Sequence, residues 1–158
     1  MDDPVYAGPP SVIAMGGACA LFDEDGRVLL VRHTYGRLNW EVPGGGAEPG
    51  ESPDETAIRE MREETGLDVA VDRLTGVYYE VGPNPGYDHE PIVHFVFLAR
   101  SLDARAPEAR HPEIGEVGWF QLDALPTPIS DFTERRIRDA ASGREASVIR
   151  VQERAWRD

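Results

Sequence analysis

The sequence predicts one α/β or α+β domain, and three observations support this. Its 158 residues, 41% of them hydrophobic, can build one sizeable core but are too few to suggest two domains. Apolar segments of strand type alternate with two helical segments along the chain. The stretches between them are rich in Pro, Gly and charged residues, which are typical of loops. Mixed strands with two helices indicate a layered sandwich.

The chain is predicted to begin with two strands. Residues 12–22 are largely apolar with small residues among them, and residues 28–33 (VLLVRH) form a second apolar run. The Asp-Glu-Asp-Gly sequence at 23–26 is typical of a turn, so the two strands are expected to pair as a hairpin. Cys19 has apolar neighbours and is expected to be an inert thiol in the core.

A first helix is predicted over residues 53–65. Ser52 and Glu55 form a capping box around its start, with Pro53 at the first helical position. Gly66 stands where a left-handed residue ends a helix. The residues expected to face the core are Ala57, Ile58 and Met61.

Three more strands are expected near residues 69–81, 92–100 and 116–121. The intervening residues 82–91 and 103–115 are expected to form loops because of their Pro, Gly and charge content.

A second helix is predicted over residues 131–142. Ser130 or Asp131 is expected to cap its start, and Gly143 to end it. Its basic residues are expected to form a solvated face: Arg135, Arg136 and Arg138.

The formal net charge of −13 argues against nucleic acid or an anionic membrane as the main partner. An anionic small molecule remains compatible with this charge if a metal ion supplies the positive charge. The N-terminal sequence MDDPVYAGPP has no apolar segment of signal-peptide type, and the 11-residue run VIAMGGACALF is too short to span a bilayer. The expected location is therefore the cytoplasm.

An acidic cluster on the first helix is the main functional signal. Glu60, Glu63 and Glu64 are spaced i, i+3 and i+4, so they share one helical face, and Glu64 is expected at a surface-facing position. Like charges at this spacing destabilise a helix, whereas a hard cation such as Mg²⁺ would offset their repulsion. The glycines at 44–46 allow backbone to approach a ligand closely. The usual explanation for an acidic run, a solvated helix face, does not account for this combination.

Residues 45–67 resemble the Nudix box, G-x5-E-x7-R-E-U-x-E-E-x-G-U, in which U is a bulky aliphatic residue. The matching residues are Gly45, Glu51, Arg59, Glu60, Met61, Glu63, Glu64, Gly66 and Leu67. Met61 stands where Ile, Leu or Val is commoner, which leaves the chemistry intact. The resemblance covers roughly residues 12–142, with an N-terminal extension before it (1–11) and a C-terminal tail after it (143–158).

The resemblance implies an α/β/α sandwich with a mixed sheet between helices. It also implies metal-dependent hydrolysis of a pyrophosphate linkage in a nucleoside diphosphate derivative, either an ADP-ribose-like compound or a nucleoside triphosphate. Mg²⁺, or Mn²⁺ in its place, would be bound by Glu60, Glu63, Glu64 and the Gly44 carbonyl. Arg59 would orient these carboxylates, with Glu51 nearby. The partner would be a small nucleotide, and the chain could act alone or as a homodimer.

The resemblance leaves the general base open between Glu60 and a glutamate on a later loop. Glu113 and Glu116, in HPEIGEVGWF just before a predicted strand, are the local candidates. A carboxylate that does not bind the metal has the more suitable pKa for a base, which favours Glu113.

The substrate is less well determined. Arg32, Arg37 and Trp40 lie just before the box, where family members often contact phosphate or base. Arg32 could equally be a surface charge, and a Trp at position 40 is more often a core residue than a stacking platform. The sequence at 83–86 (Pro-Asn-Pro-Gly) resembles the proline-bearing loop of ADP-ribose pyrophosphatases but is also an ordinary turn sequence. A non-catalytic nucleotide sensor of the same fold is the alternative function, which the three intact glutamates disfavour.

Overall fold

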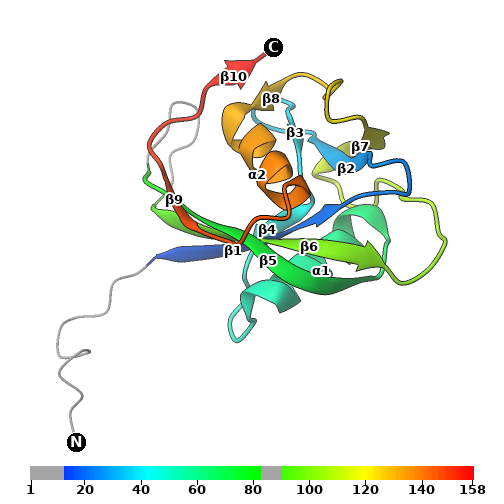
Figure 1. Cartoon of the computed structure of the whole chain (residues 1–158), viewed down its shortest axis with the longest axis horizontal. Helices are drawn as coiled ribbons and strands as arrows, with labels where there is room; N and C mark the ends of the chain where they lie inside the picture. The colour runs from blue at the N-terminus through cyan, green and yellow to red at the C-terminus, as the bar shows by residue number, and fades with distance from the viewer. Residues whose placement is uncertain (1–12, 83–89) are drawn as a thin grey trace, which may run out of the picture.

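Figure 1 shows the computed structural model of the chain, which describes residues 13–82 and 90–158. The strands are β1 (Ala14–Leu21), β2 (Val28–His33), β3 (Trp40–Glu41), β4 (Gly44–Gly46), β5 (Val69–Glu80), β6 (Ile92–Ser101), β7 (Ile114–Phe120), β8 (Ile129–Ser130), β9 (Val148–Val151) and β10 (Trp156–Arg157). The helices are α1 (Pro53–Thr65) and α2 (Asp131–Ala141).

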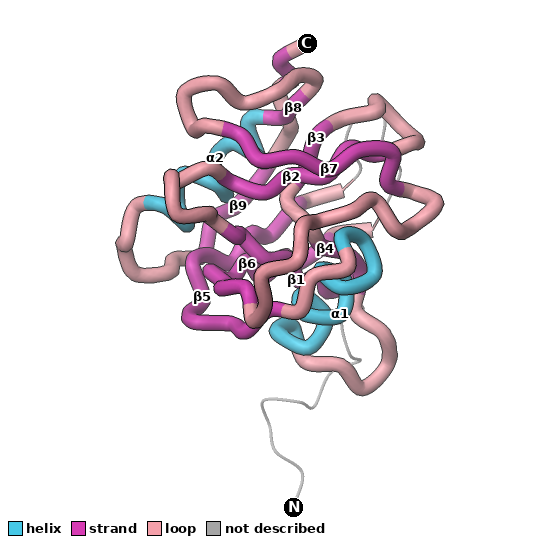
Figure 2. Tube along the Cα trace, turned by 90° about the vertical axis from the view of Figure 1, so that its right-hand side faces the viewer, coloured by secondary structure: helices cyan, strands magenta, loops and turns pink. Residues whose placement is uncertain are grey.

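The main sheet is mixed and has the strand order β4-β1-β6-β5-β9. β1 runs parallel to β6, whereas β5 pairs with β6 antiparallel. A second sheet has the order β3-β2-β7, and β8 pairs with β10. In Figures 1 and 2 the main sheet lies between α1 on one face and α2 on the other. The predicted α/β/α sandwich with a mixed sheet between helices is confirmed.

Helix α1 begins and ends where the sequence predicts. The Glu55 carboxylate accepts a hydrogen bond from the Ser52 backbone N–H at 2.9 Å. The Ser52 hydroxyl faces the Glu55 N–H in the same capping box without the geometry of a full hydrogen bond. Gly66 has φ of +76° and donates its N–H to the Arg62 carbonyl. Ala57 and Met61 are fully buried, and Ile58 packs against the same core.

Close packing of α1 on β1 depends on a glycine. A Cβ atom at Gly17 would lie 2.3 Å from the Pro53 carbonyl oxygen and 3.0 Å from the Ala57 nitrogen, so only glycine lets the first turn of α1 approach β1 this closely. Cys19, on the same strand, is fully buried, as predicted, and burial raises the pKa of its thiol to about 12.

The predicted hairpin of the first two strands is wrong. Both edges of β1 are occupied, by β4 on one side and β6 on the other, so β2 cannot pair along it. A single bridge between Phe22 and Val28 closes the turn. The chain then crosses to the second sheet, where β2 pairs with β3 and β7.

Helix α2 is capped by Ser130, whose side-chain oxygen accepts the Thr133 N–H at 3.1 Å. Arg135 and Arg138 are largely exposed, with 56% and 65% of their side chains accessible, as predicted. Arg136 is an exception, because it is 4% exposed and ion-paired with Glu41. The prediction of a solvated face is therefore wrong for Arg136.

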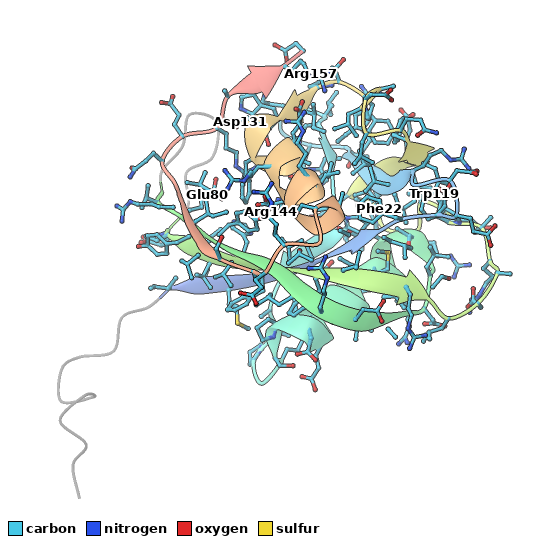
Figure 3. All side chains as sticks on the ribbon, viewed as in Figure 1. Phe22, Glu80, Trp119, Asp131, Arg144 and Arg157 are labelled. Carbon is cyan, nitrogen blue, oxygen red and sulfur yellow. The ribbon has the colours of Figure 1, made fainter. Side chains whose placement is uncertain are left out.

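The segment predicted as a C-terminal tail packs onto the body of the domain. β9 pairs parallel to β5, and β10 pairs with β8 just before α2. Figure 3 labels Glu80 at the end of β5, Asp131 at the start of α2 and Arg157 in β10. Neither helix in the described part of the chain is long and apolar enough to cross a membrane.

Candidate active site

Arg59 connects the acidic face of α1 to the loop before it. Its Nε donates to Glu51 at 2.7 Å, and its Nη1 donates to Glu60 at 2.9 Å and Glu63 at 3.0 Å. Its Nη2 donates to the Gly46 carbonyl at 2.9 Å and to Glu51 again at 3.0 Å. The hydrogen bonds from Arg59 lower the pKa of Glu51 to about 2. One guanidinium thus contacts Glu51, Glu60 and Glu63, whereas Glu64, the third carboxylate of the predicted set, instead accepts the Gly44 N–H.

The glycine strand β4 lies against the same carboxylates. A Cβ atom at Gly45 would lie 2.4 Å from Glu60 Oε1 and 3.0 Å from Oε2, so the space beside Glu60 exists because this residue is glycine. The Gly44 N–H donates to Glu64 Oε2 at 3.1 Å. The glycine run forms a short strand paired antiparallel with β1.

Glu60 and Glu64 carry charge that the protein compensates poorly. Glu64 is 7% exposed, where a surface-facing position was predicted. Burial, followed by the neighbouring charge of Glu60, raises the pKa of Glu64 to about 9. Burial also raises the pKa of Glu60, although Arg59 acts against this. Both carboxylates would ionise more readily with a cation beside them.

The residues predicted to bind metal are brought together at this face, but they are held by protein contacts. Within residues 13–82 and 90–158, no three His, Cys, Asp or Glu side chains form a preassembled metal site. Arg59 bonds one oxygen each of Glu60 and Glu63.

Comparison with known proteins identifies the family. The model of the NUDIX domain matches residues 14–140. The chain belongs to the Nudix hydrolase family. It is 33% identical over 143 residues to a MutT-like protein of Streptomyces ambofaciens, a match that covers 90% of this chain and 86% of that protein.

Two further similarities agree with this assignment. The chain is 36% identical over 135 residues to an ADP-ribose pyrophosphatase of Mycobacterium tuberculosis, covering 80% of this chain and 59% of that protein. The crystal structure of a MutT NUDIX hydrolase from Burkholderia pseudomallei superposes with a TM-score of 0.67 at 28% identity. The match covers 82% of this chain and 98% of the Burkholderia pseudomallei chain. The predicted Nudix family is confirmed.

The two candidate loop glutamates of this Nudix domain lie in different surroundings. Glu113 precedes β7, and its charge contributes to raising the pKa of Glu64. The charge of His111, in the same loop, acts on Glu60. Glu116 lies within β7, not before it, and pairs with Arg32 at 2.8 Å. The structure therefore places Glu113 near the Nudix carboxylates and Glu116 in a surface ion pair.

The residues predicted to contact substrate lie in or next to the second sheet, where Arg32 is in register with Trp40 across β2 and β3. Arg32 donates to Glu116 and to the Leu38 carbonyl. Arg37 pairs with Asp158 at 2.9 Å, and its guanidinium lies 4.7 Å from the centre of the Trp156 ring.

Trp40 is 6% exposed and packs in the core, where its ring meets Phe120 edge-on at 4.8 Å. A substrate contact by any of the three side chains stays a prediction. The proline-bearing sequence at 83–86 lies outside the described residues.

A cavity of about 250 Å³ is lined in part by β4, the strand that also contacts Glu60 of α1. Its lining includes the glycines of β4 together with Glu41, Arg136, Arg154 and His94. Sequence reasoning missed Arg136 and Arg154 as lining residues, because arginines in a helix and in a terminal segment are usually solvated. The apolar residues that flank Arg136 at helical spacing were the sequence feature that could have indicated its burial.

Proposed function

We propose that the chain catalyses metal-dependent hydrolysis of the pyrophosphate linkage in a nucleoside diphosphate derivative. The similarity to an ADP-ribose pyrophosphatase of Mycobacterium tuberculosis supports this class of substrate. ADP-ribose-like compounds and nucleoside triphosphates are the candidates.

The observation that carries the proposal is the poorly compensated pair of carboxylates beside a glycine strand. Burial raises the pKa values of both Glu60 and Glu64, and the neighbouring charge of Glu60 raises that of Glu64 further. The space at Gly45, which a Cβ would fill, lies directly against Glu60. Carboxylate and carbonyl oxygens are the donors that Mg²⁺ and Mn²⁺ prefer. These residues therefore fit a hard divalent cation.

Glu60, Glu63, Glu64 and the Gly44 carbonyl would hold the metal. A bound Mg²⁺ supplies charge neutralisation for the pyrophosphate and polarisation of the phosphorus centre. This explains how a protein with a net charge of −13 could accept a polyanion.

The other residues have supporting roles. Arg59 keeps Glu60 and Glu63 oriented and is itself fixed by Glu51. Glu113 accepts the proton of the attacking water. Its position near Glu64, outside the hydrogen bonds of Arg59, supports this role over Glu60, which a cation would make less basic.

The test is a panel of nucleoside diphosphate derivatives and nucleoside triphosphates incubated with the protein and Mg²⁺, with detection of the nucleoside monophosphate product. We expect turnover that disappears in EDTA and returns with excess Mg²⁺ or Mn²⁺. Turnover at full rate in EDTA would contradict the metal dependence. Nucleotide binding by calorimetry without hydrolysis of any compound would identify a non-catalytic sensor instead.

A further inference from the structure

The loop before β7 is attached to the C-terminal end of α1. The last carbonyl groups of a helix have no partner within the helix and need donors from elsewhere. Here the Glu108 N–H donates to the Thr65 carbonyl at 2.9 Å, and the Arg110 N–H donates to the Glu64 carbonyl at 3.1 Å. The loop is therefore bonded to the backbone of Glu64, whose carboxylate belongs to the proposed metal site.

The end of the same loop is attached to β2 through Thr34, the residue that follows this strand. The Thr34 N–H donates to the Glu113 carbonyl at 2.8 Å. The Thr34 hydroxyl donates to the Pro112 carbonyl at 2.9 Å, across 78 residues of sequence. One residue outside the loop thus holds two consecutive peptide groups of the loop, one of them with its side chain.

A β-bulge lies directly beside these contacts. The pairing of β2 with β7 shifts between Arg32 and His33, which makes Gly115 the extra residue of the bulge. A Cβ atom at Gly115 would lie 3.2 Å from Thr34 Cγ2, so glycine lets Thr34 lie close to the bulge. Bulges bend a strand and redirect the neighbouring side chains, often next to active sites. The chain therefore changes direction immediately after Glu113.

These contacts fix the backbone of Glu113 and leave its carboxylate accessible. Its carbonyl accepts from Thr34, and its N–H donates to His111 Nδ1 at 3.3 Å. Its side chain is 63% exposed, and Oε2 lies 3.9 Å from His111 Nδ1, which is too far for a hydrogen bond. A general base needs this combination of a fixed position and access to the attacking water.

From this arrangement we infer, on the basis of the proposed function, that Thr34 is a positioning residue for hydrolysis. Its hydroxyl holds the loop so that the Glu113 carboxylate meets the attacking water without a closing motion of the loop. Thr34 acts through the backbone of residues 112 and 113, so its effect on the rate depends on the carboxylate of Glu113.

The test compares Thr34→Val, which keeps the shape of threonine without its hydroxyl, with Thr34→Ser, which keeps the hydroxyl. We expect Thr34→Val to lower kcat about fivefold, within the usual effect of one hydrogen bond, with KM and Mg²⁺ affinity unchanged. Thr34→Ser should restore most of this loss. A parent kcat in Thr34→Val, or an equal loss in Thr34→Ser, would overturn the inference.

A double-mutant cycle distinguishes positioning of Glu113 from a general effect on the fold. In a Glu113→Gln background, Thr34→Val should cause no further loss of kcat, because the group that Thr34 positions is already absent. The same fivefold loss in both backgrounds would mean that Thr34 acts independently of Glu113 and would also overturn the inference.

Amide hydrogen exchange, measured by NMR without substrate, tests the attachment of the loop directly. Exchange at residues 111–115 should be faster in Thr34→Val than in the parent and in Thr34→Ser, with exchange in α2 unchanged as the control for folding. Unchanged exchange in the loop would show that the hydroxyl does not hold it. A parent protein that cleaves no nucleotide of the panel would contradict the proposed function, and the exchange rates would still decide whether Thr34 holds the loop.

Discussion

Two pairs of shielded carboxylates, Glu60 and Glu64 on α1 and Glu41 and Glu80 toward α2, have pKa values that move in opposite directions. Burial raises the pKa of Glu60 and Glu64 on the α1 side. Burial also opposes ionisation of Glu41 and Glu80 on the α2 side, but Arg136, Arg154 and His94 hold their pKa values below the usual range.

The difference between the pairs is the number of cations that the fold supplies. Each carboxylate on the α2 side faces a buried guanidinium. On the α1 side, Arg59 alone is shared by Glu51, Glu60 and Glu63, and Glu64 has the Gly44 N–H. Carboxylates that each have a guanidinium partner have a structural role. Carboxylates with too few cationic partners retain affinity for an external cation. The predictions below test this contrast, beginning with the largest effect.

Replacing Glu64 by glutamine should lower the rate of pyrophosphate hydrolysis by about 10³-fold or more, because the proposed metal site would lose the charge of one ligand. The fold should remain intact, since the amide can still accept the Gly44 N–H. The measurements are turnover with saturating Mg²⁺ and a circular dichroism spectrum. A rate near that of the parent would show that Glu64 is not a ligand.

The same variant should change how stability depends on pH when metal is absent. Folding raises the pKa of Glu64 to about 9, from about 4.3 in an unfolded chain. The folded protein therefore binds the extra proton, so the free energy of unfolding should fall as pH rises between these two values. Urea unfolding in EDTA at pH 5, 7 and 9 should show this decline in the parent. The decline should be smaller in Glu64→Gln, and equal slopes would contradict the uncompensated charge.

On the compensated side, Arg154→Met should lower the free energy of unfolding by about 3 kcal/mol, because it leaves Glu80 buried without its guanidinium. Arg157→Met is the matched control in the same segment. It breaks a pair whose arginine is 51% exposed, and it should cost less than about 1 kcal/mol. Urea unfolding of both variants gives the comparison. Equal costs would mean that compensation of Glu80 contributes little to stability.

Removing the carboxylate of Glu113 should lower kcat by about 10²-fold, the usual effect of losing a general base, with metal affinity little changed. Glu60→Gln should instead weaken metal binding. Glu116→Gln is the matched control, since Glu116 pairs with Arg32 in β7. The measurements are pH–rate profiles with Mg²⁺ titrations. If Glu60→Gln alone removes the basic limb of the profile, the base lies on α1.

The smallest effect is expected at the starts of the two helices. Ser52→Ala should cost about 1 kcal/mol or less, because Glu55 still accepts the backbone N–H of residue 52. Ser130→Ala should cost more, about 2 kcal/mol, since its buried side chain accepts the Thr133 N–H in the network that reaches Glu41. Thermal melts of both variants show which substitution lowers the stability more. The opposite order would show that the α2 network does not depend on its cap.

The elements that the sequence predicted well are those specified by neighbouring residues. Helix α1 has the predicted bounds because its caps and its apolar spacing are local. The Arg59 contacts follow from the same spacing, since Glu60 and Glu63 lie within one turn of it. The hairpin of β1 and β2 was predicted wrongly because strand pairing depends on competition with distant strands.

The sequence by itself determined the Nudix helix, its acidic face and the family, because these depend on residues close together in the chain. The tertiary structure decided which charges are compensated. Arg136 meets Glu41 across 95 residues, and Arg154 meets Glu80 across 74. Burial depends on how the layers assemble, because an arginine on a solvated helix face and an arginine in a core can have the same local sequence. For this reason the cavity beside β4 became visible only in the folded domain.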